Sequence, residues 1–200
     1  MLGVMLYLRK FYIVDIWKIV VSSLLLTISG LLGAKLMFWI ESGKVGGVSF
    51  FGAIFLPPLS MSLVAMLLSI PVGTLLDMCA PAECIMLALL KIKCFFDGCC
   101  KGKVIYVVDT LEIRFPSQMI EMLTVLGVFV FLLVLIRKGK YAYQIYAWYM
   151  VGYGITRFGL NLLRETEPFV WILPAGNFWA LISSVIGVIW IVICKRKKLR

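Results

Sequence analysis

The chain has 200 residues, of which 62% are hydrophobic and 15% charged, with a mean hydropathy of +1.03 and a net charge of +10. Soluble domains average about 45–50% apolar and about 25% charged residues, and disordered chains have low hydrophobicity. The composition therefore excludes both classes. It predicts an all-α, polytopic transmembrane helix bundle that forms one integral membrane domain over residues 1–200. At about 20 residues per span, the chain has room for about five to seven spans.

Six apolar segments are candidate spans. In chain order they are Ile19–Ile40, Val48–Ile70, Leu75–Phe96, Met119–Ile136, Ala142–Leu163 and Gly176–Cys194. Pro57 and Pro58 interrupt the second segment, and Asp77, Glu83 and Lys91 make the third the weakest. Because each apolar segment is joined to the next by a short loop, the pattern predicts a bundle of about six helices.

The basic residues predict an orientation. They flank the first segment, separate the fourth from the fifth and close the chain, at Arg9-Lys10, Lys18, residues 137–140 and residues 195–200. With six spans these stretches share one side, which the positive-inside rule makes cytoplasmic. We therefore expect both termini inside and a multi-pass protein of the cytoplasmic membrane, with no cleavable signal peptide. Since the basic runs sit beside apolar segments, nucleic acid is not an expected partner.

Polar side chains gather at the opposite ends of the predicted spans. They are Gly46–Ala53, Lys91, Lys93, Ser117, Gln118, Glu121, Arg157, Asn161 and Arg164. Arg157, Asn161 and Arg164 follow the i, i+4, i+7 spacing that puts side chains on one helical face. Ionisable groups inside a membrane are costly, so their convergence predicts a polar cavity in the outer leaflet. Lys35 either snorkels to the headgroups or contributes to such a site.

The charges in this cavity favour an anion. Arginine forms paired hydrogen bonds with phosphate, and lysine supplies a point charge. Phospholipid headgroups are the anions present at this depth. The residues therefore indicate a protein that handles phospholipid, and leave open whether it binds, moves or modifies the lipid.

Four blocks carry a resemblance to a known family, the bacterial phosphatidylglycerol–prolipoprotein diacylglyceryl transferases. Residues 46–53 (GGVSFFGA) resemble the family's GGxSFHGG, and residues 91–103, preceded by Asp77, Ala80 and Pro81, resemble its GRxGNFxNGE signature or the GCFxxGCCxGK form of shorter relatives. Residues 114–121 (RFPSQMIE) resemble RHPSQLYE, and residues 152–164 resemble GYGxxRFxxEFFR. The resemblance implies seven spans, of which this chain lacks the first, leaving six with both termini inside.

The resemblance also implies a reaction at the outer face of the membrane. A diacylglyceryl group passes from phosphatidylglycerol to the thiol of a lipobox cysteine on a prolipoprotein, and glycerol phosphate leaves. The implied partners are this lipid donor and the prolipoprotein peptide; no metal or other cofactor is expected. Such a site must hold a phosphate, stabilise its departing charge and deprotonate a thiol.

Matched positions then imply catalytic roles. Arg157 is the expected phosphate clamp, Lys91 stands where the family has its signature arginine, and Tyr153 matches a tyrosine on the Arg157 helix. Glu121 and Gln118 are expected to orient the site. The other expected substrate-binding residues are Ser117, Gly47, Ser49, Asn161, Arg164 and Asp97.

The chain also departs from the family pattern. The family's histidine falls on Phe51, a glutamate on Asn161, and the signature's asparagine and glutamate on Cys94 and Cys99. The general base is therefore open, with Asp97 and Glu121 as candidates. The orienting role is favoured for Glu121, because a carboxylate held by an arginine is a poor base for a thiol.

Two other functions stay open. A catalytically inactive or altered homologue would still bind phospholipid or lipoprotein precursors. Cys94, Cys99 and Cys100 would alternatively form a redox or metal site, but adjacent cysteines rarely close a relaxed disulfide and the chain has no histidine to complete a metal shell. Small buried hydrophobes in a turn after Gly98 are the simpler interpretation of these cysteines.

Overall fold

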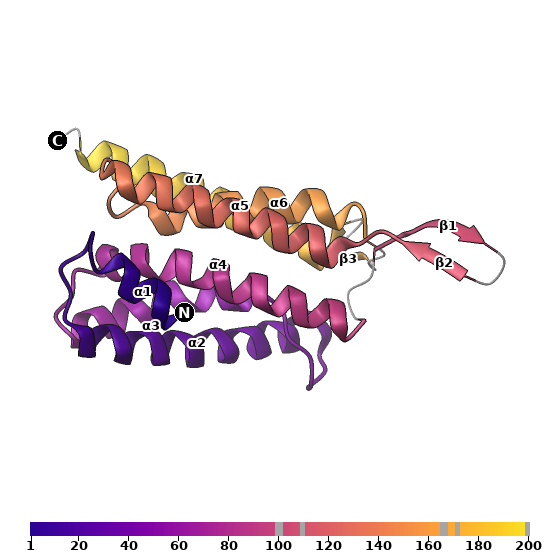
Figure 1. The fold of residues 1–200 in the computed structure, drawn as a ribbon, viewed down its shortest axis with the longest axis horizontal. Coiled ribbons are helices and arrows are strands. Elements are labelled where there is room, and N and C mark those ends of the chain that lie inside the picture. Colours follow the sequence, from indigo (N-terminus) through magenta and orange to yellow (C-terminus); the bar gives the residue numbers. More distant parts are fainter. Residues whose placement is uncertain (99–101, 109–110, 165–167, 171–172, 199–200) are drawn as a thin grey trace.

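The computed structural model describes residues 1–98, 102–108, 111–164, 168–170 and 173–198. Within these ranges seven helices and two short hairpins form an elongated bundle (Figure 1). The helices are α1 (Leu2–Leu8), α2 (Ile16–Ser42), α3 (Gly52–Leu67), α4 (Val72–Phe96), α5 (Ser117–Lys138), α6 (Ile145–Asn161) and α7 (Ala175–Lys198). The strands are β1 (Val104–Val108), β2 (Leu111–Arg114), β3 (Pro168–Val170) and β4 (Leu173–Pro174).

The six longer helices, α2 to α7, coincide with the six predicted apolar segments. Among the described residues, 3 helices are long and apolar enough to cross a membrane: Ile16–Ser42, Ser117–Lys138 and Ala175–Arg196. The helix α3 is apolar but shorter, α4 carries the charges noted above, and α6 has 17 residues. The helical architecture is thus confirmed, while a crossing by all six helices stays a prediction.

The helices form two layers. The helices α1 to α4 lie in one layer and α5 to α7 in the other, with α4 packed against α5 between them (Figure 1). One end of the bundle, here called the basic end, brings together the start of α4, the turn before α6 and the last turns of α5 and α7. The opposite end, here called the polar end, joins the start of α5 to the last turns of α4 and α6. This alternation of helix directions places the predicted basic and polar residues at opposite ends.

The two hairpins occupy segments that the sequence analysis treated only as loops. The strands β1 and β2 pair antiparallel and project beyond the polar end (Figure 1), and β3 pairs antiparallel with β4. The run Val-Ile-Tyr-Val-Val in β1 is rich in β-branched residues, which favour strands. Gly102 forms an isolated bridge with Arg164, which ties the first hairpin to the segment that follows α6.

The helix α1 was not predicted. It runs back along α2 and α4 and buries Met5 and Leu8 completely. Thr27 Oγ1 lies 3.3 Å from Met1 Sδ, so the first residue lies beside the middle of α2. Arg9 and Lys10 then fall in the connector that leads into α2.

Close backbone contact between α2 and α3 positions the loop that joins them, which contains most of the glycine-rich block of residues 46–53. A Cβ atom on Gly33 would lie 2.2 Å from the carbonyl oxygen of Gly52, and one on Gly52 would lie 1.8 Å from that of Gly33. Glycine at both positions permits this approach, as small residues do between membrane helices. The Ser49 N–H also donates to the Ala34 carbonyl at 2.9 Å. The loop is therefore held against α2 from both sides.

The two prolines of α3 leave backbone carbonyls without their usual helical donors. Pro58 has no N–H for the Ile54 carbonyl, four residues earlier. The Tyr146 hydroxyl of α6 donates to this carbonyl at 2.9 Å and also lies 3.0 Å from Glu83 of α4. A tyrosine from another helix thus satisfies the carbonyl that proline releases, as the absence of water in a membrane interior demands.

Asp77 caps α6 from the first turns of α4. Its carboxylate accepts the backbone N–H groups of Tyr143 at 2.6 Å and Ile145 at 2.9 Å, and it lies 3.3 Å from the Tyr12 hydroxyl. Burial, and then the charge of Asp77, raise the pKa of Tyr12, so its hydroxyl remains a donor. Asp77 therefore connects α4, α6 and the N-terminal connector at the basic end.

Candidate functional site

Glu121 lies at the centre of an ion cluster at the polar end. Its Oε2 atom is 3.0 Å from Lys91 Nζ and 3.4 Å from an Arg164 guanidinium nitrogen. Its Oε1 atom accepts from an Arg157 guanidinium nitrogen at 2.5 Å and lies 3.4 Å from the Tyr153 hydroxyl. Four of the predicted catalytic and binding residues thus meet at the fifth, Glu121. We call these five residues the Glu121 cluster.

Four members of the cluster lie on helices, and Arg164 lies in the segment that follows α6. Lys91 comes from the last turns of α4, Glu121 from the first turns of α5, and Tyr153 and Arg157 from successive turns of α6. Tyr153 and Arg157 are four residues apart and therefore share a helical face. The expected face of Arg157, Asn161 and Arg164 is corrected in one respect, because α6 ends at Asn161. Arg164 reaches Glu121 from the segment after the helix, which its bridge to Gly102 holds in place.

The cluster combines deep burial with excess positive charge. The side chains of Lys91 and Glu121 are 1% and 2% exposed, whereas those of Arg157 and Arg164 keep 12% and 9%. Three cations surround one carboxylate, so the formal charge of the five residues sums to +2. Buried charges are stable only when paired. An excess beside two partly open guanidinium groups therefore suits an anion.

The loop before α3 forms one wall of the site. The Lys91 ammonium lies 4.2 Å from the ring centroid of Phe50, and Phe51 packs edge-on against Tyr153 with centroids 5.8 Å apart. Ser49 is buried and donates to Glu41 Oε1 at 2.8 Å. The position of the family's histidine, Phe51, is thus filled by a ring that packs against the cluster.

Glu41, which ends α2, is a site residue that the sequence reasoning missed. Its carboxylate interacts electrostatically with Arg157, and among the described contacts its one hydrogen-bond donor is Ser49. With Glu41 the described charges around Arg157 comprise two carboxylates and the cations Lys91 and Arg164. The available signal was an acidic residue at the end of an apolar segment, directly before the glycine-rich block.

Two amides are buried where α6 ends and α7 begins. Asn161 and Asn177 are 3% and 2% exposed, and the side-chain oxygen of each lacks a hydrogen-bond partner among the described residues, as does the Asn161 amide nitrogen. Gly176, which precedes Asn177 in the chain, lies against Asn161, since a Cβ atom there would lie 2.2 Å from Asn161 Nδ2. Unpaired buried polar atoms are rare in folded proteins and call for a partner. Asn177 was also missed by the sequence reasoning, which placed it inside an apolar segment.

The remaining predicted residues are placed as follows. Ser117 and Gln118 are buried at the start of α5, beside Glu121. Gly47 packs against Phe38, whose ring would lie 2.3 Å from an added Cβ atom. Asp97 pairs with Lys93 on the exposed surface at the end of α4, and no described contact joins it to Glu121. The structure therefore brings most of the candidates together and sets Asp97 apart.

A surface cavity of about 480 Å³ adjoins the loop before α3. It is lined by Lys35, Leu36, Trp39, Val45, Gly46 and Gly47. Lys35 is exposed on α2, one turn before Trp39, so its ammonium lies beside the glycine pair of the loop. Both predictions for Lys35 stay open, because a lysine that snorkels to the headgroups from this position would also border the cavity beside Gly46 and Gly47.

The proposed redox or metal site involves Cys94, Cys99 and Cys100. Cys94 is half-buried, whereas Cys99 and Cys100 lie outside the described residues. Within the described ranges no three histidine, cysteine, aspartate or glutamate side chains are grouped to hold a metal ion. The described part of the site is therefore a cluster of cations, carboxylates and amides.

The apolar helices and the buried cationic cluster together fit a membrane protein that accommodates an anionic ligand. Comparison with known families agrees with this class. The prolipoprotein diacylglyceryl transferase family matches residues 2–193, and the chain belongs to this family.

Two relatives show how far the chain has diverged. It is 25% identical over 197 residues to phosphatidylglycerol–prolipoprotein diacylglyceryl transferase 2 of Clostridium perfringens, covering 86% of this chain and 77% of the relative. It is 24% identical over 164 residues to phosphatidylglycerol–prolipoprotein diacylglyceryl transferase of Dehalococcoides mccartyi, covering 76% of this chain and 63% of the relative. The chain therefore spans less than two thirds of the second relative's length.

Proposed function

We propose that the chain transfers a diacylglyceryl group from phosphatidylglycerol to the lipobox cysteine thiol of a prolipoprotein, at the outer face of the bacterial cytoplasmic membrane. The observation that carries this proposal is the Glu121 cluster, in which three cations converge on one carboxylate at the polar end of the bundle. A phosphate bound there has its charge compensated before the reaction begins. The negative charge that grows on the departing glycerol phosphate is then stabilised by groups already in position.

Within this proposal Glu121 orients the cations. Both of its oxygens are within bonding distance of basic groups, Oε1 to Arg157 and Oε2 to Lys91 and Arg164. No oxygen of Glu121 is left to take up a proton from a thiol. We therefore assign Arg157 to the phosphate, with Lys91 and Arg164 beside it, and Glu121 to positioning.

Glu41 is the better candidate for the general base. It keeps a carboxylate oxygen without a described donor, and Ser49 holds the other. In the proposed step the thiol proton moves to Glu41 while the sulfur attacks the terminal carbon of the diacylglyceryl group. The bond from that carbon to the phosphate oxygen breaks, and glycerol phosphate leaves. Asp97 remains the alternative base, although it pairs with Lys93 on the surface.

The buried amides would bind the uncharged part of the donor. Asn161 and Asn177 present unpaired oxygens, and phosphatidylglycerol carries hydroxyl groups on its terminal glycerol. A site built to bond a hydroxyl strongly rejects analogues that lack it. Asn161→Leu and Asn177→Leu are therefore expected to reduce the preference for phosphatidylglycerol over a lipid without these hydroxyls.

We propose that residues 1–200 form one membrane domain with six spans, α2 to α7, and that the basic end is cytoplasmic. Support comes from the alternating helix directions and from the basic residues at one end of the bundle. A reporter fused after Arg200 should be active only if it requires the cytoplasm. Activity of an exported reporter at this position would contradict the orientation.

The central test is complementation of a bacterial strain depleted of its own transferase. Incorporation of labelled lipid into a lipoprotein precursor is the readout. The proposed roles predict two different pH profiles: Glu41→Gln should lose nearly all activity at every pH, removing the rise of the wild-type rate with pH. Glu121→Gln should lower the rate by a similar factor across the pH range. Wild-type pH dependence that persists in Glu41→Gln would assign the base elsewhere.

A second function is favoured by one observation. Phe51 occupies the position of the family's histidine and packs against Tyr153, and Asn161 replaces a glutamate. A homologue that binds phospholipid or prolipoprotein without transferring lipid would show the same cluster. It would bind short-chain phosphatidylglycerol in an Arg157-dependent manner and still fail to incorporate labelled lipid.

A further inference from the structure

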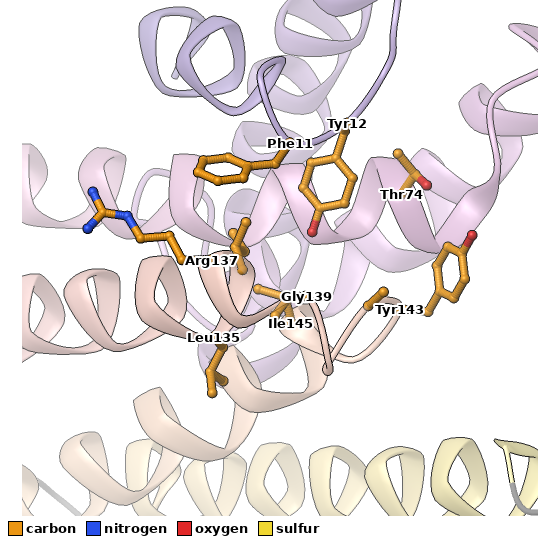
Figure 2. A pocket seen from close by; sticks show the side chains of 10 residues that line it. Phe11, Tyr12, Thr74, Leu135, Arg137, Gly139, Tyr143 and Ile145 are labelled. Carbon is orange, nitrogen blue, oxygen red and sulfur yellow. The ribbon is translucent and has the colours of Figure 1, made fainter.

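A second cavity (Figure 2) lies at the basic end of the bundle, whereas the Glu121 cluster lies at the polar end. Its volume is about 350 Å³. The connector between α1 and α2 contributes Phe11 and Tyr12, α4 contributes Thr74, and the junction of α5 and α6 contributes Arg137 and Tyr143. The wall is thus mainly aromatic and aliphatic, with the hydroxyl groups of Tyr12, Thr74 and Tyr143 and the guanidinium of Arg137.

Two cations contact Tyr7: Arg137, which lines this cavity, and Lys10, which directly precedes the lining residue Phe11. The Lys10 ammonium lies 3.7 Å from the ring centroid of Tyr7, and an Arg137 guanidinium nitrogen donates to the Tyr7 hydroxyl at 3.3 Å. Both cations lower the pKa of the Tyr7 hydroxyl. Lys10 and Arg137 are far apart in the sequence, and both contact the exposed side chain of Tyr7. Like charges so close repel each other unless an anion lies between them.

The described carboxylates near this end do not supply that anion. Asp15 pairs with Lys18 at 3.6 Å. Asp77 is occupied by the backbone N–H groups of Tyr143 and Ile145 and by the Tyr12 hydroxyl. Lys10 and Arg137 therefore have no carboxylate partner among the described contacts, and Arg9, Lys138 and Lys140 add to the positive charge nearby.

We propose that this cavity binds the headgroup of an anionic phospholipid of the cytoplasmic leaflet. The phosphate would lie between Lys10 and Arg137, and the glycerol part of the lipid would enter beside Phe11 and Thr74. Anionic lipids supply the negative potential of that leaflet, and the aromatic wall suits the interface between headgroups and acyl chains. The site rests on the proposed orientation of the bundle and not on the transfer reaction.

Such a lipid would link the two layers of the bundle. Lys10 belongs to the connector that leads into α2, whereas Arg137 belongs to the last turn of α5. A phosphate bonded to both would replace their repulsion with two attractions. Binding to the folded protein alone raises its stability by mass action, so anionic lipid should also stabilise the bundle against heat.

The test uses the full chain purified in an uncharged detergent, in an Arg157→Ala background. This background removes the proposed site at the Glu121 cluster, so the result does not depend on the transferase proposal. The probes are dihexanoyl phosphatidylglycerol, dihexanoyl phosphatidylcholine and inorganic phosphate, and the readouts are dissociation constants from native mass spectrometry and the melting temperature. The variants are Lys10→Gln with Arg137→Gln, and a matched control, Lys195→Gln with Arg196→Gln, which removes the same charge at the same end.

We expect phosphatidylglycerol to bind at least tenfold more tightly than the other two probes and to raise the melting temperature. The Lys10→Gln, Arg137→Gln pair should weaken this binding at least tenfold, and the control pair should change it less than threefold. Lys10→Arg should retain binding, which separates loss of the site from loss of the fold. Equal weakening by both pairs, equal binding of phosphatidylcholine, or equal binding of inorganic phosphate would each overturn the proposal.

Discussion

Two carboxylates are buried at opposite ends of this bundle, and their partners differ in kind. Asp77 at the basic end is 1% exposed and bonds to neutral donors, two backbone N–H groups and a tyrosine hydroxyl. Glu121 at the polar end is 2% exposed and bonds mainly to cations.

The difference indicates what each carboxylate does. Neutral donors satisfy Asp77 without adding charge, which suits a cap that holds the start of α6. Three cations around Glu121 exceed what one carboxylate compensates, so its surroundings suit a further anion. Burial alone would not have separated these roles, whereas the chemistry of the partners does.

The largest expected effect comes from Arg157→Ala. Removing the guanidinium that touches both Glu121 and the proposed phosphate should lower lipid transfer by about 100-fold or more, within the range for groups that act on the transition state. Arg157→Lys should retain part of the activity, because it keeps the charge and loses the planar pair of donors. Lys93→Ala removes a cation from the exposed surface nearby and should remain active. Full activity of Arg157→Ala in labelled-lipid incorporation would show that the Glu121 cluster does not bind the phosphate through Arg157.

The next effect is that of Glu121→Gln. Losing the one carboxylate of the cluster leaves Lys91, Arg157 and Arg164 close together without their shared partner, and breaking a buried pair costs about 3–5 kcal/mol. We expect both a lower unfolding temperature and a rate reduced about tenfold or more at every pH. Binding of phosphatidylglycerol should recover part of the lost stability, because the ligand supplies negative charge. If Glu121→Gln unfolds at the wild-type temperature, the ion pairs of Glu121 do not contribute to the stability of the bundle.

Asp77→Ala should act on stability and leave chemistry intact. It removes the acceptor for Tyr143 N–H, Ile145 N–H and the Tyr12 hydroxyl, at a cost of about 3 kcal/mol. Asp77→Asn keeps an acceptor oxygen and should cost about 1 kcal/mol. Activity per folded molecule should be unchanged for both variants in detergent. A selective loss of activity by Asp77→Asn, with normal stability, would contradict a purely structural role.

The smallest effect concerns Tyr146, which bonds the carbonyl that Pro58 leaves unpaired. Tyr146→Phe should destabilise the bundle by about 1 kcal/mol, as hydrogen bonds between membrane helices do. In a Pro58→Ala background the helix supplies its own N–H to Ile54, so the same substitution should cost less. A double-mutant cycle measures this coupling. Identical costs in both backgrounds would show that proline and tyrosine act independently.

Much of the architecture could be predicted from the sequence. Hydropathy marked α2 to α7 within a few residues, because a membrane helix must bury its backbone hydrogen bonds along one continuous apolar segment. It missed α1, whose seven residues are too short for such a signal, and it missed the hairpins, whose strands lie in short mixed loops. Charge patterning correctly separated the basic end from the polar end. Met1 lies beside Thr27, and the side of the membrane on which the N-terminus lies stays a prediction.

The sequence identified some features of the site, and the tertiary structure identified the others. The sequence by itself determined which residues lie near the polar end, because position along a span gives depth, and family-like blocks marked Lys91, Glu121, Tyr153 and Arg157. Only the tertiary structure decided that Glu121 is the common partner, that Asp97 stands apart and that Glu41 interacts with Arg157. The physical reason is that helical periodicity gives the relative directions of side chains on one helix, whereas the neighbour that each face meets depends on how the helices pack. In this protein the packing is decided by contacts such as Gly33 on Gly52, which no single segment contains.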